Sequence, residues 1–312
     1  MVLEWYRLIP PTMPALDSSL LTSRDSGRPA RFWVGIDGGG TSTRALVASA
    51  DGRILGRGEA GASALGQGAE QAWRHIAEAI ANAGVASLEL ADCALGLGLS
   101  GTGVPSQLQA FVAGDPGVAR FTLVTDGLTA LLGAHGGQPG ALLISGTGSV
   151  AEALLPDGTR RMVGGWGWQI GDEGSGAWLG QQAMKLAQAA YDNRAAAGPL
   201  VQAVWQQAGT TRAALLGFCA HAGQGGYASL APLVFEHEAD DPAATVLLEQ
   251  AARALDVLGA AVHPTLPLAL AGSIALRLAP RLSPALQSRR VEPQGDAASG
   301  ALWLIQQELS PA

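Results

Sequence analysis

Two short glycine-rich segments, each directly after a run of apolar residues, carry the groups best suited to binding phosphates. Their residues are Asp37, Gly38, Gly39, Gly40, Thr41 and Ser42 in the first segment, and Gly146, Thr147, Gly148 and Ser149 in the second. Without Cβ atoms, successive backbone N–H groups can converge on phosphate oxygens, and the hydroxyls add further donors. Asp37 is placed to hold Mg²⁺ through water, because this ion gives up its hydration shell reluctantly. Either segment alone would be typical of a plain hairpin; together they predict a nucleotide site.

A carboxylate suited to proton transfer stands at Asp126, directly after the apolar run 121–125. Ligand-binding groups in open α/β sheets follow the carboxyl ends of buried strands. We expect Asp126 to accept the proton of a hydroxyl that attacks the γ-phosphate, although positioning and charge neutralisation dominate phosphoryl transfer. The structural alternative is that Asp126 only caps the helix beginning at Gly127.

A third segment combines indole rings with carboxylates. Trp166 and Trp168 precede Asp172 and Glu173 in a glycine-rich stretch. Sugars present apolar C–H faces and a rim of hydroxyls, so this combination suits a sugar, although either Trp could equally be a packing residue. Ser100 and Gly101, which follow the apolar run 92–99, are expected to line the same cleft.

Apolar patterning and turn signals predict the elements that position these groups. Three strands joined by short turns are expected at 32–37, 41–49 and 53–60, and the same pattern recurs at 141–145, 149–155 and 159–165. Further strands are expected at 92–99, 121–125 and 268–272, and helices at 69–84, 105–113, 176–192, 196–208, 211–222, 243–262 and 295–309. The repeated pattern predicts two similar α/β halves that face each other.

Composition narrows the classes of function. The 312 residues suggest two domains, 48% are hydrophobic and 14% are charged, and the net charge is −7. With a single lysine, Lys185, and no basic stripe, we expect no nucleic-acid or anionic-membrane partner. Two cysteines make no disulfide framework, and no apolar run reaches membrane-spanning length, so we expect a cytoplasmic protein. Residues 1–30 are interrupted by prolines and are interpreted as a flexible N-terminal extension.

Six motifs in order along the chain resemble the BadF/BadG/BcrA/BcrD ATPase family, within it most of all the glucosamine and N-acetylglucosamine kinases. The motifs are VGIDGGGTST (34–43), LVTDGLTALLGAH (123–135), ALLISGTGS (141–149), GWGWQIGDEGSGAW (165–178), LAGSIA (270–275) and PQGDAASGAL (293–302). The resemblance covers about residues 32–308 and places the chain in the actin-like ATPase superfamily.

This resemblance implies two ribonuclease-H-like domains, each a mixed sheet flanked by helices, with ATP and sugar in the interdomain cleft. The domains would be 31–137 with the C-terminal helix 298–312, and 138–297. It implies an ATP- and Mg²⁺-dependent kinase acting on the 6-hydroxyl of glucosamine or N-acetylglucosamine, and it leaves a homodimer open. Beyond the two phosphate loops, Gly272 and Ser273 match the adenosine motif, with Ser299 and Gly300 beside it. Asp126 falls at the position of the base, and Asp172 at that of a carboxylate that binds sugar hydroxyls.

One departure from the family concerns the sugar. Many of these kinases carry an Asn after the third strand, where this chain has Ala64 or, less well aligned, Ser63. A methyl group cannot replace the donor and acceptor of an amide. Sugar preference therefore cannot be copied from the family, and Ser63 remains a candidate contact.

Three other functions compete with the kinase. Gly96, Gly98 and Gly101 form a G-x-G-x-x-G pattern after a strand, as in a nicotinamide-dependent dehydrogenase, but Pro105 delays the next helix. An iron–sulfur activator ATPase of the same family would need cysteines near the cleft, whereas Cys93 and Cys219 fall in a strand and a helix. A non-catalytic sensor of this fold would not need Asp126.

Overall fold

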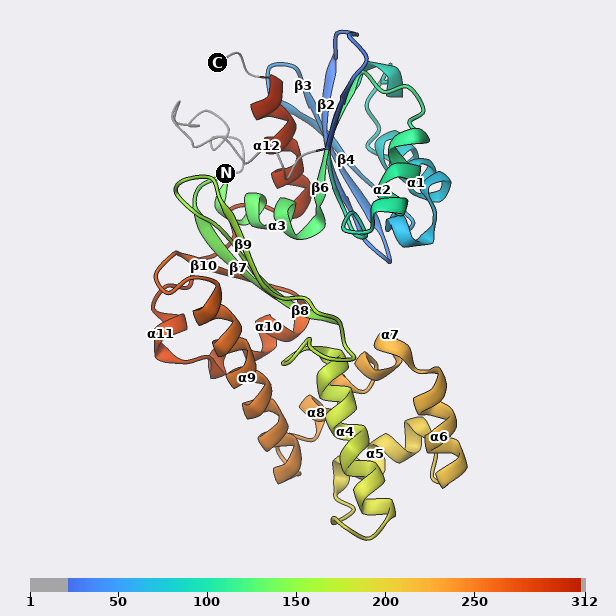
Figure 1. Cartoon of the computed structure of the whole chain (residues 1–312), viewed down its shortest axis with the longest axis vertical. Coiled ribbons are helices and arrows are strands. Elements are labelled where there is room, and N and C mark those ends of the chain that lie inside the picture. The colour runs from blue at the N-terminus through green and yellow to red at the C-terminus, as the bar shows by residue number, and fades with distance from the viewer. Residues whose placement is uncertain (1–21, 310–312) are drawn as a thin grey trace. The chain divides into compact units, whose positions relative to one another are not determined.

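The computed structural model describes residues 22–309, and these form two compact units (Figure 1). Unit 1 comprises the chain up to Gly140, the segment Leu154–Arg160 and the chain from Glu292 onward. Unit 2 comprises Ala141–Ala153 and Arg161–Val291. These limits differ from the expected ones at 137 and 297, and the tip of one hairpin, Leu154–Arg160, groups with unit 1.

Unit 1 contains a six-stranded mixed sheet in the order β1-β6-β5-β2-β3-β4. The strands are β1 (Thr22–Asp25), β2 (Phe32–Gly38), β3 (Thr43–Ser49), β4 (Ile54–Ala60), β5 (Cys93–Leu99) and β6 (Arg120–Thr125). The meander β2–β3–β4 is antiparallel as predicted, whereas β2, β5 and β6 run parallel. The carboxyl ends of three strands therefore meet at one edge of this sheet.

Helices cover both faces of the first sheet (Figure 1). On one face lie α1 (Ala69–Asn82) and α2 (Pro105–Ala113), which share an apolar core with β2 and β5. The other face carries α3 (Asp126–His135) and α12 (Ala297–Leu309). Any Cβ atom at Gly35 or Gly96 would collide with the carbonyls of Ala298 and Ala301 in α12. These glycines therefore allow the helix backbone to approach the strands closely.

Unit 2 contains a four-stranded sheet in the order β10-β7-β8-β9. Its strands are β7 (Gly140–Ser145), β8 (Ser149–Leu154), β9 (Arg160–Gly164) and β10 (Leu268–Ala271). Because β7 and β10 are parallel, with Ala271 opposite Ile144, the segments that follow them begin at the same edge.

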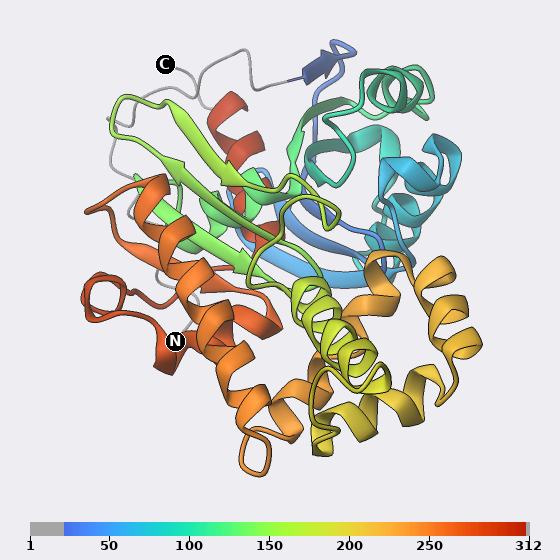
Figure 2. The same ribbon diagram turned by 60° about the horizontal axis from the view of Figure 1, so that its bottom comes forward.

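Helices make up the remainder of unit 2 (Figure 2). They are α4 (Gly176–Tyr191), α5 (Pro199–Ala208), α6 (Arg212–His221), α7 (Gly223–Ala228), α8 (Ala231–Glu236), α9 (Pro242–Val262), α10 (Ser273–Leu278) and α11 (Pro284–Gln287). The long α9 begins at a cap made by Asp241, which also accepts the N–H of Leu200 and is 5% exposed. The acidic stretch 236–241 therefore ends in a buried structural carboxylate.

The α/β prediction, with two mixed sheets flanked by helices, is confirmed, but some elements differ from expectation. The irregular extension expected up to residue 30 contains β1, which pairs antiparallel with β6; residues 1–21 lie outside the described part. The short helices α7, α8, α10 and α11 were not predicted from the sequence. The helices expected to begin at 196 and 295 begin at Pro199 and Ala297.

Candidate active site

Three of the predicted segments in unit 1 begin at one edge of the first sheet. In the parallel register Gly38 lies opposite Leu99, and Leu99 lies opposite Thr125. The first glycine loop (38–42), Ser100 with Gly101, and Asp126 therefore follow three neighbouring strand ends. The structure brings these predicted residues together as an open α/β sheet requires for a ligand site.

The carbonyls of the first glycine loop are held by neighbouring segments. The N–H of Ser100 donates to the Gly38 carbonyl at 3.0 Å, and the N–H groups of Ser63 and Ala64 both donate to the Gly39 carbonyl at 3.1 Å. Within the described residues, the N–H groups of Gly40 and Thr41 have no hydrogen-bond partner. No atom lies within 4 Å of where a Cβ of Gly39 would be, so the loop leaves room for a ligand.

Ser63 lies behind this loop. Its side chain is fully buried and accepts a hydrogen bond from the Thr43 hydroxyl at 2.7 Å. A Cβ on Gly38 would collide with the Ser63 hydroxyl, so that position requires glycine. The structure thus gives Ser63 a supporting position, whereas Ala64 beside it is partly exposed.

Asp37 is the last residue but one of β2 and lies near other charged groups. Burial raises the pKa of its carboxyl to about 6; Arg44 acts in the opposite direction, and the charges of Asp126 and Asp296 add to the rise. Arg44 lies opposite Asp37 in the sheet register, with Nη1 3.8 Å from Oδ2 of the carboxylate. A desolvated carboxylate near other carboxylates is suited to a cation.

Asp126 is the first residue of α3, but it is not the residue that caps this helix. The Thr125 hydroxyl makes the cap by accepting the N–H of Leu128 at 3.2 Å, so the capping alternative for Asp126 is wrong. One carboxylate oxygen of Asp126 accepts the N–H of Gly127 at 2.9 Å. Arg160 donates to the Thr125 hydroxyl at 2.7 Å and so supports the turn that carries Asp126. No motif in the sequence identified Arg160 as a site residue.

In unit 2 the second glycine loop is held by the first turn of α4. The N–H groups of Gly176 and Ala177 donate to the carbonyls of Gly146 (2.8 Å) and Thr147 (3.1 Å). Gly272 has a φ of +87°, and a Cβ there would collide with the Ser145 carbonyl. The predicted adenosine-motif residues Gly272 and Ser273 therefore lie directly beside the second loop.

Asp172 also borders the second loop. A Cβ on Gly148 would come 2.7 Å from Oδ2 of Asp172, which accepts a hydrogen bond from Gln224 at 2.9 Å. Asp172 is 4% exposed with a φ of +56°, and burial raises its pKa. Gln224 lies in the glycine-rich α7, and nothing in the sequence predicted its contact with Asp172.

The two indole rings, left undecided by the sequence, have different surroundings. Trp168 packs 5.6 Å from the ring of Tyr227, whereas Trp166 is 76% exposed. A packing role fits Trp168, and Trp166 keeps its ring available to a ligand.

Ser299 and Gly300 lie in α12 of unit 1. A Cβ on Gly300 would collide with the Thr129 carbonyl in α3, and the Ser299 hydroxyl donates to Asp296 at 2.6 Å. Close contact between α12 and α3 accounts for this glycine. Contact of Ser299 and Gly300 with ATP stays a prediction.

The structure also bears on the competing functions. A Cβ on Gly96 or Gly98 would collide with α12 or with Thr129, so helix packing accounts for two glycines of the dinucleotide pattern. Cys93 is buried in unit 1 and Cys219 is exposed in unit 2. Residues 22–309 contain no cluster of three or more His, Cys, Asp or Glu suited to a metal ion. Over the same range, no helix has the length and apolar character needed to cross a bilayer.

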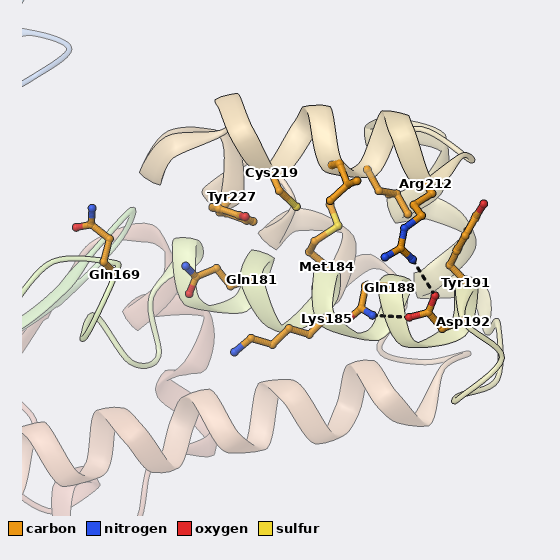
Figure 3. A pocket seen from close by; sticks show the side chains of 12 residues that line it. Gln169, Gln181, Met184, Lys185, Gln188, Tyr191, Asp192, Arg212, Cys219 and Tyr227 are labelled. Carbon is orange, nitrogen blue, oxygen red and sulfur yellow. Dashed lines mark hydrogen bonds and ion pairs between the residues drawn. The ribbon is translucent and has the colours of Figure 1, made fainter.

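A separate pocket of about 440 Å³ lies in unit 2 along α4 and α6 and contains none of the predicted site residues (Figure 3). Arg212 and Gln188 both donate to Asp192 at one end. At the other end Gln181 donates to the Trp168 carbonyl at 3.4 Å.

Comparison with known proteins identifies relatives over most of the chain. The model of the BadF/BadG/BcrA/BcrD ATPase family matches residues 34–304. The glucosamine kinase GspK of Vibrio cholerae serotype O1 is 34% identical over 278 residues, covering 87% of this chain and 94% of that protein. A crystal structure from Chromobacterium violaceum, provisionally named an N-acetylglucosamine kinase, is 44% identical with a TM-score of 0.83, over 88% of this chain and 99% of that one. A ROK hexokinase from Thermus thermophilus shares the fold alone, at 20% identity and a TM-score of 0.51 over 89% and 100% of the two chains.

Proposed function

The chain belongs to the BadF/BadG/BcrA/BcrD ATPase family, and from this premise we propose that it is an ATP-dependent amino-sugar kinase. It transfers the γ-phosphate to the 6-hydroxyl of glucosamine or N-acetylglucosamine. The names of the relatives at 34% and 44% identity support the substrate class. The observation that carries the reaction type is the common sheet edge at which Asp37 lies near the end of β2, the first glycine loop follows it, and Asp126 follows the parallel strand β6.

Both glycine loops fit the phosphates of ATP. In each loop, N–H groups of neighbouring segments donate hydrogen bonds to the loop carbonyls. Because a trans peptide is planar, the loop N–H that follows each bonded carbonyl points away from those segments. Gly39 and Gly146 have open space where a Cβ would stand. We assign the first loop and the second loop to the phosphates, and Gly272 with Ser273 to the adenosine.

Asp37 is the residue that would hold Mg²⁺. Its carboxylate is largely desolvated, and its oxygens are the type of donor that this ion prefers. A bound Mg²⁺ would supply positive charge that neutralises the phosphates.

Asp126 receives the proton of the sugar hydroxyl while that oxygen attacks the γ-phosphate. Asp172 orients the sugar by accepting from its hydroxyls, and the exposed ring of Trp166 offers an apolar face. Ser100 and Gly101, which follow β5, are assigned as further contacts of the sugar. Excluding water from the reacting groups would keep ATP from being hydrolysed.

The proposal includes a cytoplasmic location, in keeping with two free cysteines of which one is exposed. At the position where many relatives carry an Asn, the partly exposed residue is Ala64. The choice among hexosamines therefore depends on other contacts.

A coupled kinase assay over glucosamine, N-acetylglucosamine, mannosamine and glucose tests the proposal. We expect turnover with at least one of the first two sugars and a product phosphorylated at oxygen 6, identified by phosphorus–proton NMR. Rapid ATP hydrolysis that no sugar accelerates, without a phosphosugar product, would contradict it and favour an activator ATPase.

A further inference from the structure

The first glycine loop has three successive carbonyls that accept hydrogen bonds from neighbouring segments. Backbone N–H groups hold the first two, those of Gly38 and Gly39. The third, that of Gly40, accepts from the side-chain amide of Gln67, with Nε2 2.9 Å from the oxygen. Among the donors that residues 22–309 supply to these carbonyls, Gln67 is the one side chain.

Holding the Gly40 carbonyl also fixes the next N–H group. A trans peptide is planar, and its C=O and N–H point in opposite directions. With the Gly40 carbonyl bound to Gln67, the N–H of Thr41 is turned away from Gln67. That N–H has no partner among the described residues, so it is free to bind a phosphate oxygen.

Gln67 is itself held in place. Gln71, one helical turn further on, donates from Nε2 to Oε1 of Gln67 at 2.8 Å and to the Ala62 carbonyl at 3.2 Å. This bond leaves the NH₂ end of Gln67 facing Gly40.

The segment that ends at Gln67 also contacts the predicted sugar side of the site. The N–H of Leu65 donates to the Ser100 carbonyl at 2.9 Å, and Ser63 and Ala64 hold Gly39. A displacement of residues 63–67 on binding of a sugar would therefore also move the Gly39 and Gly40 carbonyls, to which this segment is hydrogen-bonded.

We infer that Gln67 is a positioning residue that couples sugar binding to the first phosphate loop. It orients the Gly40–Thr41 peptide, and it does so from the segment expected to border the sugar. The inference rests on the proposed function for the sugar half of the coupling, whereas the orientation of the loop stands without it.

The test compares Gln67→Ala and Gln67→Glu with the wild-type chain. Glu keeps the length of Gln but at neutral pH has no donor for the Gly40 carbonyl. Affinity for a non-hydrolysable ATP analogue with Mg²⁺ is measured by calorimetry, with and without glucosamine. We expect both variants to bind the nucleotide about 3- to 10-fold more weakly without sugar, the fold-change that corresponds to one lost hydrogen bond. The factor by which glucosamine strengthens nucleotide binding should fall towards one.

Gln202→Ala is the matched control. Gln202 is also exposed, and its Nε2 also donates to a backbone carbonyl, that of Ala197 at 3.3 Å, but it lies in unit 2 on α5. This variant should match the wild type in both measurements, and thermal unfolding of all variants checks that each is folded. If Gln67→Ala does not fold, Gln67→Glu decides alone.

Two results would overturn the inference. Gln67 variants that bind the analogue as tightly as Gln202→Ala would remove the positioning role. Weaker binding in which glucosamine keeps its full effect would remove the coupling. If the wild-type chain phosphorylates no sugar, the proposed function fails, and the sugar-free affinities still decide whether Gln67 positions the loop.

Discussion

Asp126 follows Thr125, and the Thr125 hydroxyl, not the Asp126 carboxylate, caps α3. We expect Asp126→Asn to lower kcat by about 10²–10⁴, the usual contribution of a general base, and to leave ATP affinity nearly unchanged. Steady-state kinetics and nucleotide titration measure the two effects separately. The same substitution at Asp51, an exposed turn residue, is the control. Turnover close to wild type in the Asp126 variant would remove the base assignment.

The carboxyl of Asp37 predicts how stability depends on pH. Its pKa is raised from 3.8 to about 6, mainly by burial, so the folded chain binds the proton more tightly than the unfolded chain. Its contribution to stability is present below about pH 4 and is lost as pH rises through about 6. Asp37→Asn should therefore raise the free energy of unfolding at pH 7, by at most about 3 kcal/mol. Urea denaturation without Mg²⁺ measures this.

The same Asp37 variant is expected to bind the magnesium nucleotide more weakly than the wild type. Greater stability together with weaker binding is what a functional carboxylate in a desolvated position produces. A variant as stable as the wild type at pH 7, with an unchanged pH profile between 4 and 6, would show that the carboxyl titrates normally.

At the scale of residues, side-chain chemistry at strand ends could be predicted from the sequence, but burial could not. Asp37, Asp126 and the glycines were identifiable because their types and neighbours are suited to phosphates. The inward position of Ser63 depends on Thr43, twenty residues earlier, and the support of Asp172 depends on Gln224 in a glycine-rich helix. Neither contact produces a periodic pattern of residues in the sequence.

Among the elements, the contact between α12 and the first sheet depends on glycine. We expect Gly96→Ala to lower the free energy of unfolding by about 1–3 kcal/mol or more, because the new methyl group collides with the Ala301 carbonyl and must displace the helix. Gly103→Ala is the control, because Gly103 lies in an exposed turn with no atom within 4 Å of the new Cβ. It should change the free energy of unfolding by less than about 0.5 kcal/mol. Equal effects in urea denaturation would show that α12 does not approach the strands so closely.

Long elements with a clear apolar period could be predicted, and short ones could not. The strands of both meanders and the helices α1, α4 and α9 follow their patterns to within a few residues. Strand β1 has four residues, of which Arg24 and Asp25 are charged, and its pairing with β6 is set by contacts far along the chain. Helices α7 and α8 are six residues each, too short to show a period.

For the whole molecule, we expect ATP hydrolysis to be slow without sugar and phosphoryl transfer to be fast with it. Kinases of this kind avoid wasting ATP when the acceptor completes the site and water is excluded. Measuring released phosphate with and without glucosamine, at saturating ATP, checks this. Hydrolysis without sugar at the rate of phosphoryl transfer would contradict the expectation.

The two-unit organisation was predictable from the repeated glycine turn, because each copy joins the first two strands of a similar meander. The limits of the units were harder to predict. The tip Leu154–Arg160 of the second meander groups with unit 1, where Arg160 donates to the Thr125 hydroxyl. No local sequence pattern indicates that this tip belongs to a different unit from the rest of its meander.

Strand β1 also has a consequence for the behaviour of the protein in concentrated solution. By pairing with β6 it covers peptide groups that would otherwise form an open template for another molecule. The new outer border is only four residues long and carries Arg24, ion-paired with Asp115, and Asp25, ion-paired with Arg120. A short, charged border is a poor partner for sheet-to-sheet growth, so this strand should protect the chain against aggregation.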